Sequence, residues 1–189
     1  AFYSITPPAL GVICFLSIII ITVYSLINGR LINLRSIKII SSKVDEQIRL
    51  MFISDTHLGS NSKKHLQKIL LKIKGLEFDL LLIGGDFIDS SSFDLDGLGI
   101  LKNIKKPILF ISGNHEYYIK DHENKIKRLN NYDITVLDNE SFKFKRLNLI
   151  GISDNLTLET QKNIASRLIQ EDLFNLILVH KPSLWDHVY

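Results

Sequence analysis

The chain has 189 residues, of which 46% are hydrophobic and 23% are charged, and its net charge is +3. These proportions exclude a disordered chain, a collagen-like repeat and a disulfide-rich miniprotein, and the net charge is too small to indicate nucleic acid binding. Residues 1–29 contain no Asp, Glu, Lys, Arg or His. We therefore expect an apolar N-terminal segment followed by one globular domain. The single cysteine, Cys14, excludes a disulfide within the chain.

The first predicted element is a membrane-spanning helix over Ala9–Ile27. A helix of this length extends about 28 Å, close to the hydrocarbon thickness of a bilayer. The stretch has no amphipathic period, Pro7 and Pro8 suit a helix start, and Asn28-Gly29 suits a helix end. The alternatives are a buried core helix and a signal peptide, although a signal peptide typically has a positive n-region and a shorter apolar core.

A basic segment over residues 30–47 follows, in which Leu34–Ile40 is β-branched and suits an edge strand. Basic residues outnumber acidic ones after the apolar stretch: they are Arg30, Arg35, Lys38, Lys43 and Arg49, against Asp45 and Glu46. The positive-inside tendency then places the domain on the cytoplasmic face of the membrane. We expect a membrane protein with one or more spans.

Residues 48–189 are predicted to form the domain. Strands are expected over Ile48–Ser54, Phe78–Ile83, Ile108–Ser112, Ile134–Leu137, Phe142–Lys145, Leu149–Ile152 and Leu176–Val179. Helices are expected over Ser62–Lys74, Phe93–Ile104, Tyr118–Asn130 and Thr160–Gln170. Strands that alternate with helices indicate an α/β fold in which the faces of the sheet are covered.

Polar residues of metal-ligand type follow four of these strands. They are Asp55 and His57 after the first strand, Asp86 after the second, Asn114 and His115 after the third, and His180 after the last. Because ligands of open α/β sheets bind at the carboxyl ends of strands, we expect these side chains at one edge. Carboxylate and imidazole ligands without thiolate suit Mn, Fe or Zn.

Each of these signals has an ordinary structural explanation when it stands alone, and a histidine after an apolar strand, such as His180, is more often structural. The four signals in this order predict a metal site. Asp86 follows Gly84-Gly85 on a tight loop, from which it can bridge two ions. Two ions about 3.5–4 Å apart stabilise both oxygens of a phosphoryl transfer and lower the pKa of a bound water. A histidine beside the ions can protonate the leaving oxygen.

Four motifs carry a family resemblance: Asp55-Thr56-His57, Gly85-Asp86, Gly113-Asn114-His115-Glu116 and His180. They resemble the successive motifs of the calcineurin-like metallophosphoesterase superfamily. The residues around them (SDTHLG, GGDFID, GNHEYY and LVHKP) resemble its membrane-anchored bacterial branch, the YkuE/YaeI-like phosphoesterases. The match covers residues 48–184. It implies a four-layer α/β/β/α sandwich, preceded here by the transmembrane helix.

The resemblance also implies roles for these residues. Asp55, His57 and Asp86 would hold one metal, and Asp86, Asn114 and His180 would hold the second. Asn114 would also help to stabilise the charge on the phosphoryl group. His115 would be the proton donor to the leaving group, oriented by the main chain and by Asp55.

One family motif, Gly-His-x-His, is absent before Tyr189. In the family its two histidines each complete one metal. Because the chain also starts at Ala1 and not at Met, we interpret it as truncated and expect the motif within a few tens of residues beyond Tyr189. The sandwich is then incomplete, and we expect the 189 residues by themselves to bind metal poorly and to be inactive.

The leading hypothesis is a membrane-anchored phosphoesterase that hydrolyses phosphomonoesters or diesters with a water activated by two divalent metal ions. The anchor indicates lipid or envelope-precursor phosphoesters as substrates, and no nucleic acid partner is expected. One alternative is a non-catalytic metal-binding or scaffold protein with an incomplete site. Another is a nuclease of the same superfamily, which the anchor and the small net charge disfavour.

Two other charged groups have ordinary interpretations. Asp89, Asp94 and Asp96, which follow Asp86, are interpreted as loop or helix-cap residues. The predicted helix over Ser62–Lys74 carries five lysines, which usually form a solvated face but near a membrane also contact anionic lipid headgroups. These are Lys63, Lys64, Lys68, Lys72 and Lys74.

Overall fold

A computed structural model describes residues 8–29 and 31–187 of the chain. The chain divides into two compact units between Lys38 and Ile39. The first unit contains helix α1 (Pro8–Asn28), whose segment Leu10–Asn28 has a mean hydropathy of 2.7 and no buried residue. By length and composition α1 is a candidate membrane span. A signal sequence near an N-terminus has similar length and composition.

The segment between α1 and the domain has no regular structure. Residues 31–49 contain neither helix nor strand, so the edge strand predicted over Leu34–Ile40 is wrong. A strand forms only when its backbone finds a partner, and β-branched residues alone do not supply one. In this segment Ile37, Ile39 and Ile40 are between 68% and 87% exposed.

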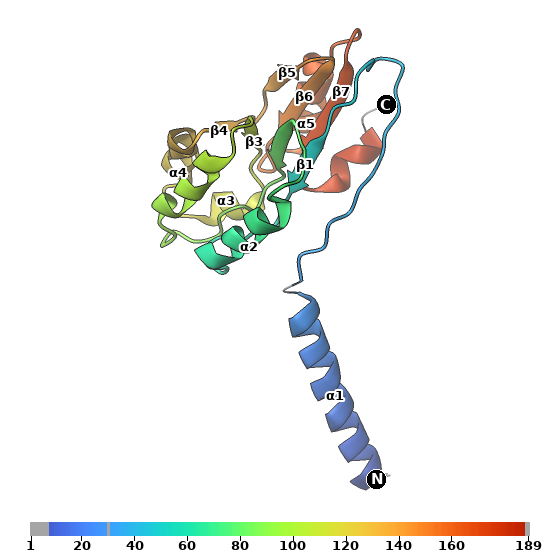
Figure 1. Cartoon of the computed structure of the whole chain (residues 1–189), viewed down its shortest axis with the longest axis vertical. Helices are drawn as coiled ribbons and strands as arrows, with labels where there is room; N and C mark the ends of the chain where they lie inside the picture. The colour runs from blue at the N-terminus through green and yellow to red at the C-terminus, as the bar shows by residue number, and fades with distance from the viewer. Residues whose placement is uncertain (1–7, 30, 188–189) are drawn as a thin grey trace. The chain divides into compact units, whose positions relative to one another are not determined.

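The second unit contains two sheets (Figure 1). The first sheet is wholly parallel and has the order β1 (Leu50–Ile53), β2 (Leu80–Ile83), β3 (Ile108–Phe110) and β4 (Ile134–Val136). The second sheet has the order β5 (Ser141–Phe144), β6 (Leu147–Ile152) and β7 (Phe174–Val179). In that sheet β5 is antiparallel to β6, whereas β7 is parallel to it.

Helices and 3₁₀ turns connect the strands. After β1 comes α2 (Lys63–Ile73), and after β2 comes the 3₁₀ segment η1 (Leu95–Asn103). Three elements lie between β3 and β4: α3 (Asn114–Tyr118), α4 (His122–Arg128) and η2 (Leu129–Tyr132). Helix α5 (Leu158–Leu168) joins β6 to β7, and η3 (Pro182–His187) follows β7.

Strand β2 separates two hydrophobic cores, because alternate side chains of a strand point to opposite faces. Leu81 and Ile83 pack in a core with Leu66 of α2 and Leu98 of η1. Leu80 and Leu82 pack on the other face in a second core with the second sheet. This second core therefore lies between the two sheets.

Strand β6 separates the second core from a third. Its residues Leu147 and Leu149 belong to the core between the sheets. Ile150 and Ile152 pack with Ala165 of α5 in a further core. The three cores thus separate four layers in the order α/β/β/α, and the predicted fold class is confirmed.

Two predicted helices differ from the observed ones. The helix expected over Tyr118–Asn130 begins only at His122, because Ile119 is extended (ψ 137°) and Asp121 takes a left-handed backbone conformation (φ 58°). The preceding helix, α3, begins at Asn114 and so contains the Asn-His pair. The helix expected over Phe93–Ile104 is 3₁₀, and its Gly97 and Gly99 lower its α-helical propensity.

Candidate metal centre

The polar residues that follow β1, β2, β3 and β7 come together at one end of the two sheets. Two groups of side chains have ligand atoms within 4.8 Å of one another. One group is His57, Asp86 and His115, and the other is Asp55, Asp86 and His180. Asp86 belongs to both groups. Five of the six sequence-predicted site residues therefore lie in these groups.

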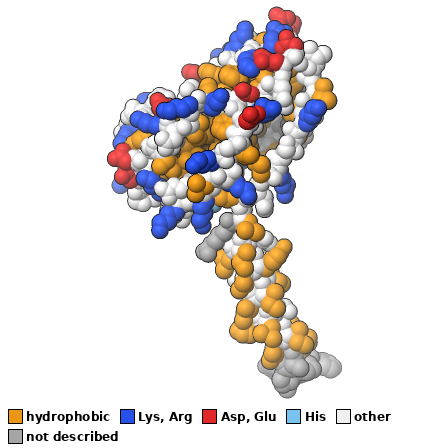
Figure 2. Space-filling view, viewed as in Figure 1, with side chains coloured by type: hydrophobic (Ala, Val, Ile, Leu, Met, Phe, Trp, Pro, Cys, Tyr) orange, Lys and Arg blue, Asp and Glu red, His pale blue; other side chains and the backbone are white. Residues whose placement is uncertain are grey.

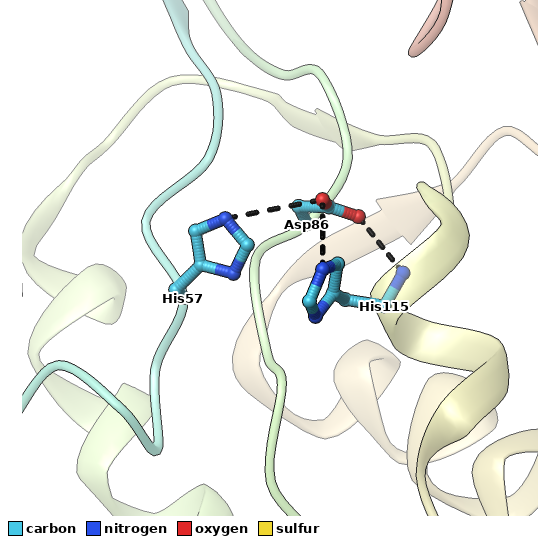
Figure 3. Close-up of side chains that lie close together, drawn as sticks. All are labelled: His57, Asp86 and His115. Carbon is cyan, nitrogen blue, oxygen red and sulfur yellow. Dashed lines mark hydrogen bonds and ion pairs between the residues drawn. The ribbon is translucent and has the colours of Figure 1, made fainter. Parts of the chain in front are cut away.

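The Asp86 carboxylate is the common centre of the site (Figure 3). Its Oδ2 atom lies 3.2 Å from Nε2 of His180 and 3.9 Å from Nε2 of both His57 and His115. Its Oδ1 atom accepts the backbone N–H of His115 at 2.9 Å. The side chain is only 5% exposed. A buried carboxylate with three imidazole neighbours is the arrangement expected of a metal ligand.

The backbone at the site is strained. Asp55, His57 and Asp86 have φ values of 55°, 45° and 50°, in the left-handed region that few residues other than glycine adopt. The two loops that carry them are joined, since Asp55 N–H donates to the Gly85 carbonyl (3.1 Å) and His57 N–H to the Asp86 carbonyl (2.9 Å). Conformations of this kind concentrate at functional sites, where the surrounding structure holds them.

Glu116 of α3 holds the loops after β2 and β3. Its buried carboxylate accepts four backbone N–H groups at 2.7–3.0 Å, from Asp86, Phe87, Ile88 and Gly113. Burial raises the pKa of Glu116, and these hydrogen bonds partly oppose that rise. Glu116 thus fixes the backbone from which Asp86 extends. The motif Gly113-Asn114-His115-Glu116 contains this residue, but the sequence alone indicates no role for it.

His180 has a defined orientation. Its Nδ1 lies 2.9 Å from the carbonyl oxygen of Gly84, and a carbonyl only accepts, so Nδ1 carries a proton. In the neutral ring, Nε2 then presents its lone pair to Asp86 Oδ2, 3.2 Å away. Two acceptors at this distance are stable only with a proton or a cation between them. The donor set therefore fits a cation.

The close approach of the loops requires glycine at position 113. A Cβ atom there would lie 2.6 Å from the backbone nitrogen of Asp86. Gly85 is also required, because its φ is +91° and a Cβ there would lie 2.7 Å from His180 Nδ1. The two glycines allow the ends of β2, β3 and β7 to meet.

Asp89 lies behind His57, whereas the sequence predicts only a loop or helix-cap residue at this position. Its Oδ2 is 3.4 Å from His57 Nδ1, and its Oδ1 accepts the Ser60 N–H at 2.9 Å. Burial raises the pKa of Asp89, but the Ser60 hydrogen bonds and the neighbouring His57 outweigh burial and leave the pKa below its usual range. Asp89 thus directs Nε2 of His57 toward Asp86. In the sequence, only its position three residues after Asp86 connects Asp89 with the site.

Asn114 and His115 lie on the first turn of α3. Asn114 Nδ2 is 3.5 Å from the Tyr118 hydroxyl, and the His115 ring packs edge-on against His57, with the ring centroids 4.7 Å apart. The His115 side chain is 39% exposed. The two groups place His115 with His57, and Asp55 with His180. Asp55 Oδ1 also lies 3.9 Å from His57 Nε2, so the pairing of Asp55 with His57 that the family resemblance implies stays a prediction.

Comparison with known proteins identifies the family. The calcineurin-like phosphoesterase profile matches residues 48–187. An uncharacterized metallophosphoesterase of Helicobacter pylori is 30% identical over 149 residues, which cover 74% of this chain and 40% of the relative. A transmembrane protein with metallophosphoesterase domain of Danio rerio is 31% identical over 135 residues, covering 67% of this chain and 31% of the relative.

The chain spans about two fifths of the length of its Helicobacter relative. The uncharacterized protein YpbG of Bacillus subtilis is 23% identical over 177 residues, with 87% of this chain and 64% of the relative covered. The assignment to the YkuE/YaeI-like branch stays a prediction. The profile match includes all four motifs, and the chain belongs to the calcineurin-like phosphoesterase family.

Proposed function

We propose that the chain contributes the metal-ligand residues of a membrane-anchored, metal-dependent phosphoesterase. The observation that supports this best is the position of Asp86 Oδ2, within 3.9 Å of Nε2 of His57, His115 and His180. These histidines come from three separate segments of the chain. Because the chain spans only part of its relatives, the activity belongs to the proposal and not to the family assignment.

The ligands are proposed to hold two divalent ions of Mn, Fe or Zn. Carboxylate, amide and imidazole donors without thiolate suit these metals. We assign Asp55, His57 and Asp86 to one ion and Asp86, Asn114 and His180 to the other. Bound divalent cations polarise a phosphoryl oxygen and lower the pKa of water, which supplies the nucleophile for hydrolysis.

His115 is proposed as the general acid. Its ring is partly exposed and fixed between His57 and Tyr118, so Nε2 can reach a substrate oxygen. As the bond from phosphorus to the leaving oxygen breaks and the bond to the water oxygen forms, His115 gives its proton to the leaving oxygen. The ring then regains a proton from solvent. The Asn114 amide donates to a non-bridging phosphoryl oxygen.

The apolar helix α1 is proposed to anchor the domain in a membrane. Its length and hydropathy support a span, and the basic residues after it support a cytoplasmic location of the domain. A relative in Danio rerio is named as a transmembrane protein. An anchored hydrolase meets substrates that lie in the same membrane, so lipid or envelope-precursor phosphoesters are the proposed substrates.

Calorimetric titration with Mn²⁺ and assays on phosphomonoesters and diesters test the proposal on the same preparations of the full-length protein. Asp86→Asn removes the shared charge and is expected to abolish Mn²⁺ binding. His115→Ala is expected to retain Mn²⁺ binding but to lower turnover by about 100-fold or more. His65→Ala, on α2 and outside both ligand groups, is the matched control and is expected to change neither.

Three outcomes would contradict the proposal or a part of it. Equal Mn²⁺ binding by Asp86→Asn and the unsubstituted protein would show that Asp86 is not a metal ligand. Strong Mn²⁺ binding without turnover of any phosphoester, in the full-length protein, would favour the non-catalytic metal-binding or scaffold alternative. Turnover that is unchanged in His115→Ala would assign the proton transfer to another group.

A further inference from the structure

Helix α2 turns a basic face with an apolar centre toward solvent. Its inner face buries Leu66, Ile69 and Ile73, and Leu66 packs in the core with Leu81 and Ile83 of β2. Its outer face is exposed and consists of Lys64, Gln67, Lys68, Leu71 and Lys72. Leu71 is 67% exposed in the middle of these lysines. We call these five residues the α2 outer face.

The charge of the α2 outer face is not compensated by acidic groups. The sequence from Ser60 to Gly75 contains no Asp or Glu, and the ion pairs between described residues do not include Lys64, Lys68 or Lys72. Figure 2 shows blue and orange side chains together in the region where Figure 1 draws α2. A helix that only needs solubility usually alternates acidic and basic residues, since like charges four residues apart repel.

Basic residues around an exposed apolar side chain suit one kind of partner, an anionic lipid surface. The ammonium groups meet lipid phosphates, and the apolar side chain enters the boundary between headgroups and acyl chains. The segment before the domain has a similar character. Between α1 and Asp45 it exposes Leu31, Leu34, Ile37 and other apolar residues beside Arg35 and Lys38, without an acidic residue.

We propose that the α2 outer face docks on the anionic surface of the membrane that α1 spans. The inference rests on the membrane anchoring in the proposed function and goes beyond it by naming the surface of the domain that meets the lipid. Residues 31–49 have no regular structure and reach at most about 68 Å, so the domain stays close to the bilayer. A short tether of this kind gives millimolar effective concentrations, at which weak lipid contacts suffice.

Docking at α2 has a consequence for the metal centre. Only five residues separate His57 from Lys63, the first residue of α2. Their loop is fixed, because Asn61 Nδ2 donates to the Thr56 carbonyl at 3.0 Å and Ser60 N–H donates to Asp89. A docked α2 therefore holds the His57 loop near the headgroups. The phosphate of an amphiphilic phosphoester lies at the same depth in the bilayer.

Fluorescence quenching by brominated lipids tests this docking in the full chain, reconstituted in phosphatidylcholine vesicles with or without phosphatidylglycerol. In a Cys14→Ser background, a fluorophore is attached at Gln67→Cys on the α2 outer face. The position control is Ser141→Cys on β5, which is also exposed. We expect quenching at position 67 only with phosphatidylglycerol, loss of that quenching in high salt, and none at position 141.

Charge reversal provides a matched pair of variants. The triple variant Lys64→Glu, Lys68→Glu and Lys72→Glu changes the α2 outer face. The control triple Lys106→Glu, Lys143→Glu and Lys162→Glu changes net charge equally at other exposed positions. Because each lysine near an anionic surface contributes about fivefold, the first triple is expected to weaken docking by at least about 100-fold. The control triple is expected to leave it unchanged.

Equal quenching at position 67 in both kinds of vesicle, or equal loss in the two triples, would overturn the docking. A label that responds to added single-stranded RNA and not to anionic lipid would assign the face to nucleic acid instead. Resistance to extraction by alkaline carbonate is measured on every sample. Resistance without quenching would overturn docking but leave the anchor in place, whereas extraction of all proteins would overturn the anchor and the docking together.

Discussion

The Glu116 carboxylate accepts the backbone N–H of Asp86 at 3.0 Å, and the Asp86 side chain is shared by both groups of candidate metal ligands. One Glu116 oxygen serves Asp86 and Gly113, and the other serves Phe87 and Ile88. The metal centre therefore depends on a buried carboxylate that does not itself belong to either ligand group.

Glu116→Gln is expected to lower the free energy of unfolding by about 2–4 kcal/mol, since the amide nitrogen cannot accept and two buried N–H groups lose their partner. Urea denaturation measures this difference. The control is Glu123→Gln, the same change at an exposed position on α4, which is expected to stay within about 0.5 kcal/mol of the parent. Equal effects of the two substitutions would show that Glu116 does not hold the loops.

Gly113→Ala is expected to destabilise the domain by about 2–3 kcal/mol and to weaken Mn²⁺ binding. The cause is space and not backbone strain, because φ of Gly113 is −87° but its Cβ would lie 2.6 Å from Asp86 N. Gly99→Ala is the control, since no atom lies within 4 Å of its Cβ position. Urea denaturation and Mn²⁺ titration of both variants check the prediction, and wild-type binding by Gly113→Ala would refute it.

Asp89→Asn is expected to lower the affinity for Mn²⁺ by about tenfold or more, because the carboxylate that orients His57 loses its charge. The matched control is Asp94→Asn. It removes the same charge from the same loop, where the Asp94 side chain caps η1, and asparagine caps helices equally well. Calorimetric titration compares the two variants. An equal loss of Mn²⁺ affinity in both variants would mean that the loop affects Mn²⁺ binding through its net charge and not through the orientation of His57.

The buried carboxyl group of Asp138 is expected to make the free energy of unfolding depend on pH. Burial raises the pKa of its carboxyl group, and hydrogen bonds from Ser112 and Tyr117 only partly oppose the rise. The folded state then binds the proton more tightly than the unfolded state. The free energy of unfolding is therefore expected to fall as pH rises from the ordinary value of 3.8 through the raised folded-state pKa.

Asp138→Asn is expected to reduce this fall and to leave the part that Glu116 contributes, because the amide does not ionise. The amide still offers a carbonyl to the Ser112 N–H and an amino group to the Ser112 hydroxyl. Urea denaturation at several pH values measures the slope. The control is Asp133→Asn. Asp133 is exposed and has a left-handed backbone conformation, which asparagine also tolerates. A slope that is the same in the parent and in Asp138→Asn would contradict the prediction.

The sequence predicted the buried strands and the position of the site because both depend on local patterns. Apolar runs such as FDLLLI become strands, and the polar residue types that follow them meet at the carboxyl ends. The structure brings Asp55, His57, Asp86, His115 and His180 together, and their roles as ligands and proton donor stay predictions.

The remaining features depend on contacts between distant segments. Leu34–Ile40 has the composition of a strand but no partner. The role of Glu116 arises from backbone N–H groups that lie as far as 30 residues away in the chain. Asp89 resembles its neighbours Asp94 and Asp96 in sequence, and only the fold places it against His57. Neither pairing nor orientation can be derived from one segment alone.

The alternation of side chains along β2 makes the metal centre sensitive to strand register. Leu81 pairs with Met51 in the observed register, and a slip of one residue would exchange Leu81 and Ile83 with Leu80 and Leu82 between the two cores. The same slip would turn Asp86 away from the histidines. If the proposed cation binds only the correctly paired chain, it stabilises that chain against mispaired alternatives. Refolding with Mn²⁺ is then expected to increase the yield of correctly paired protein.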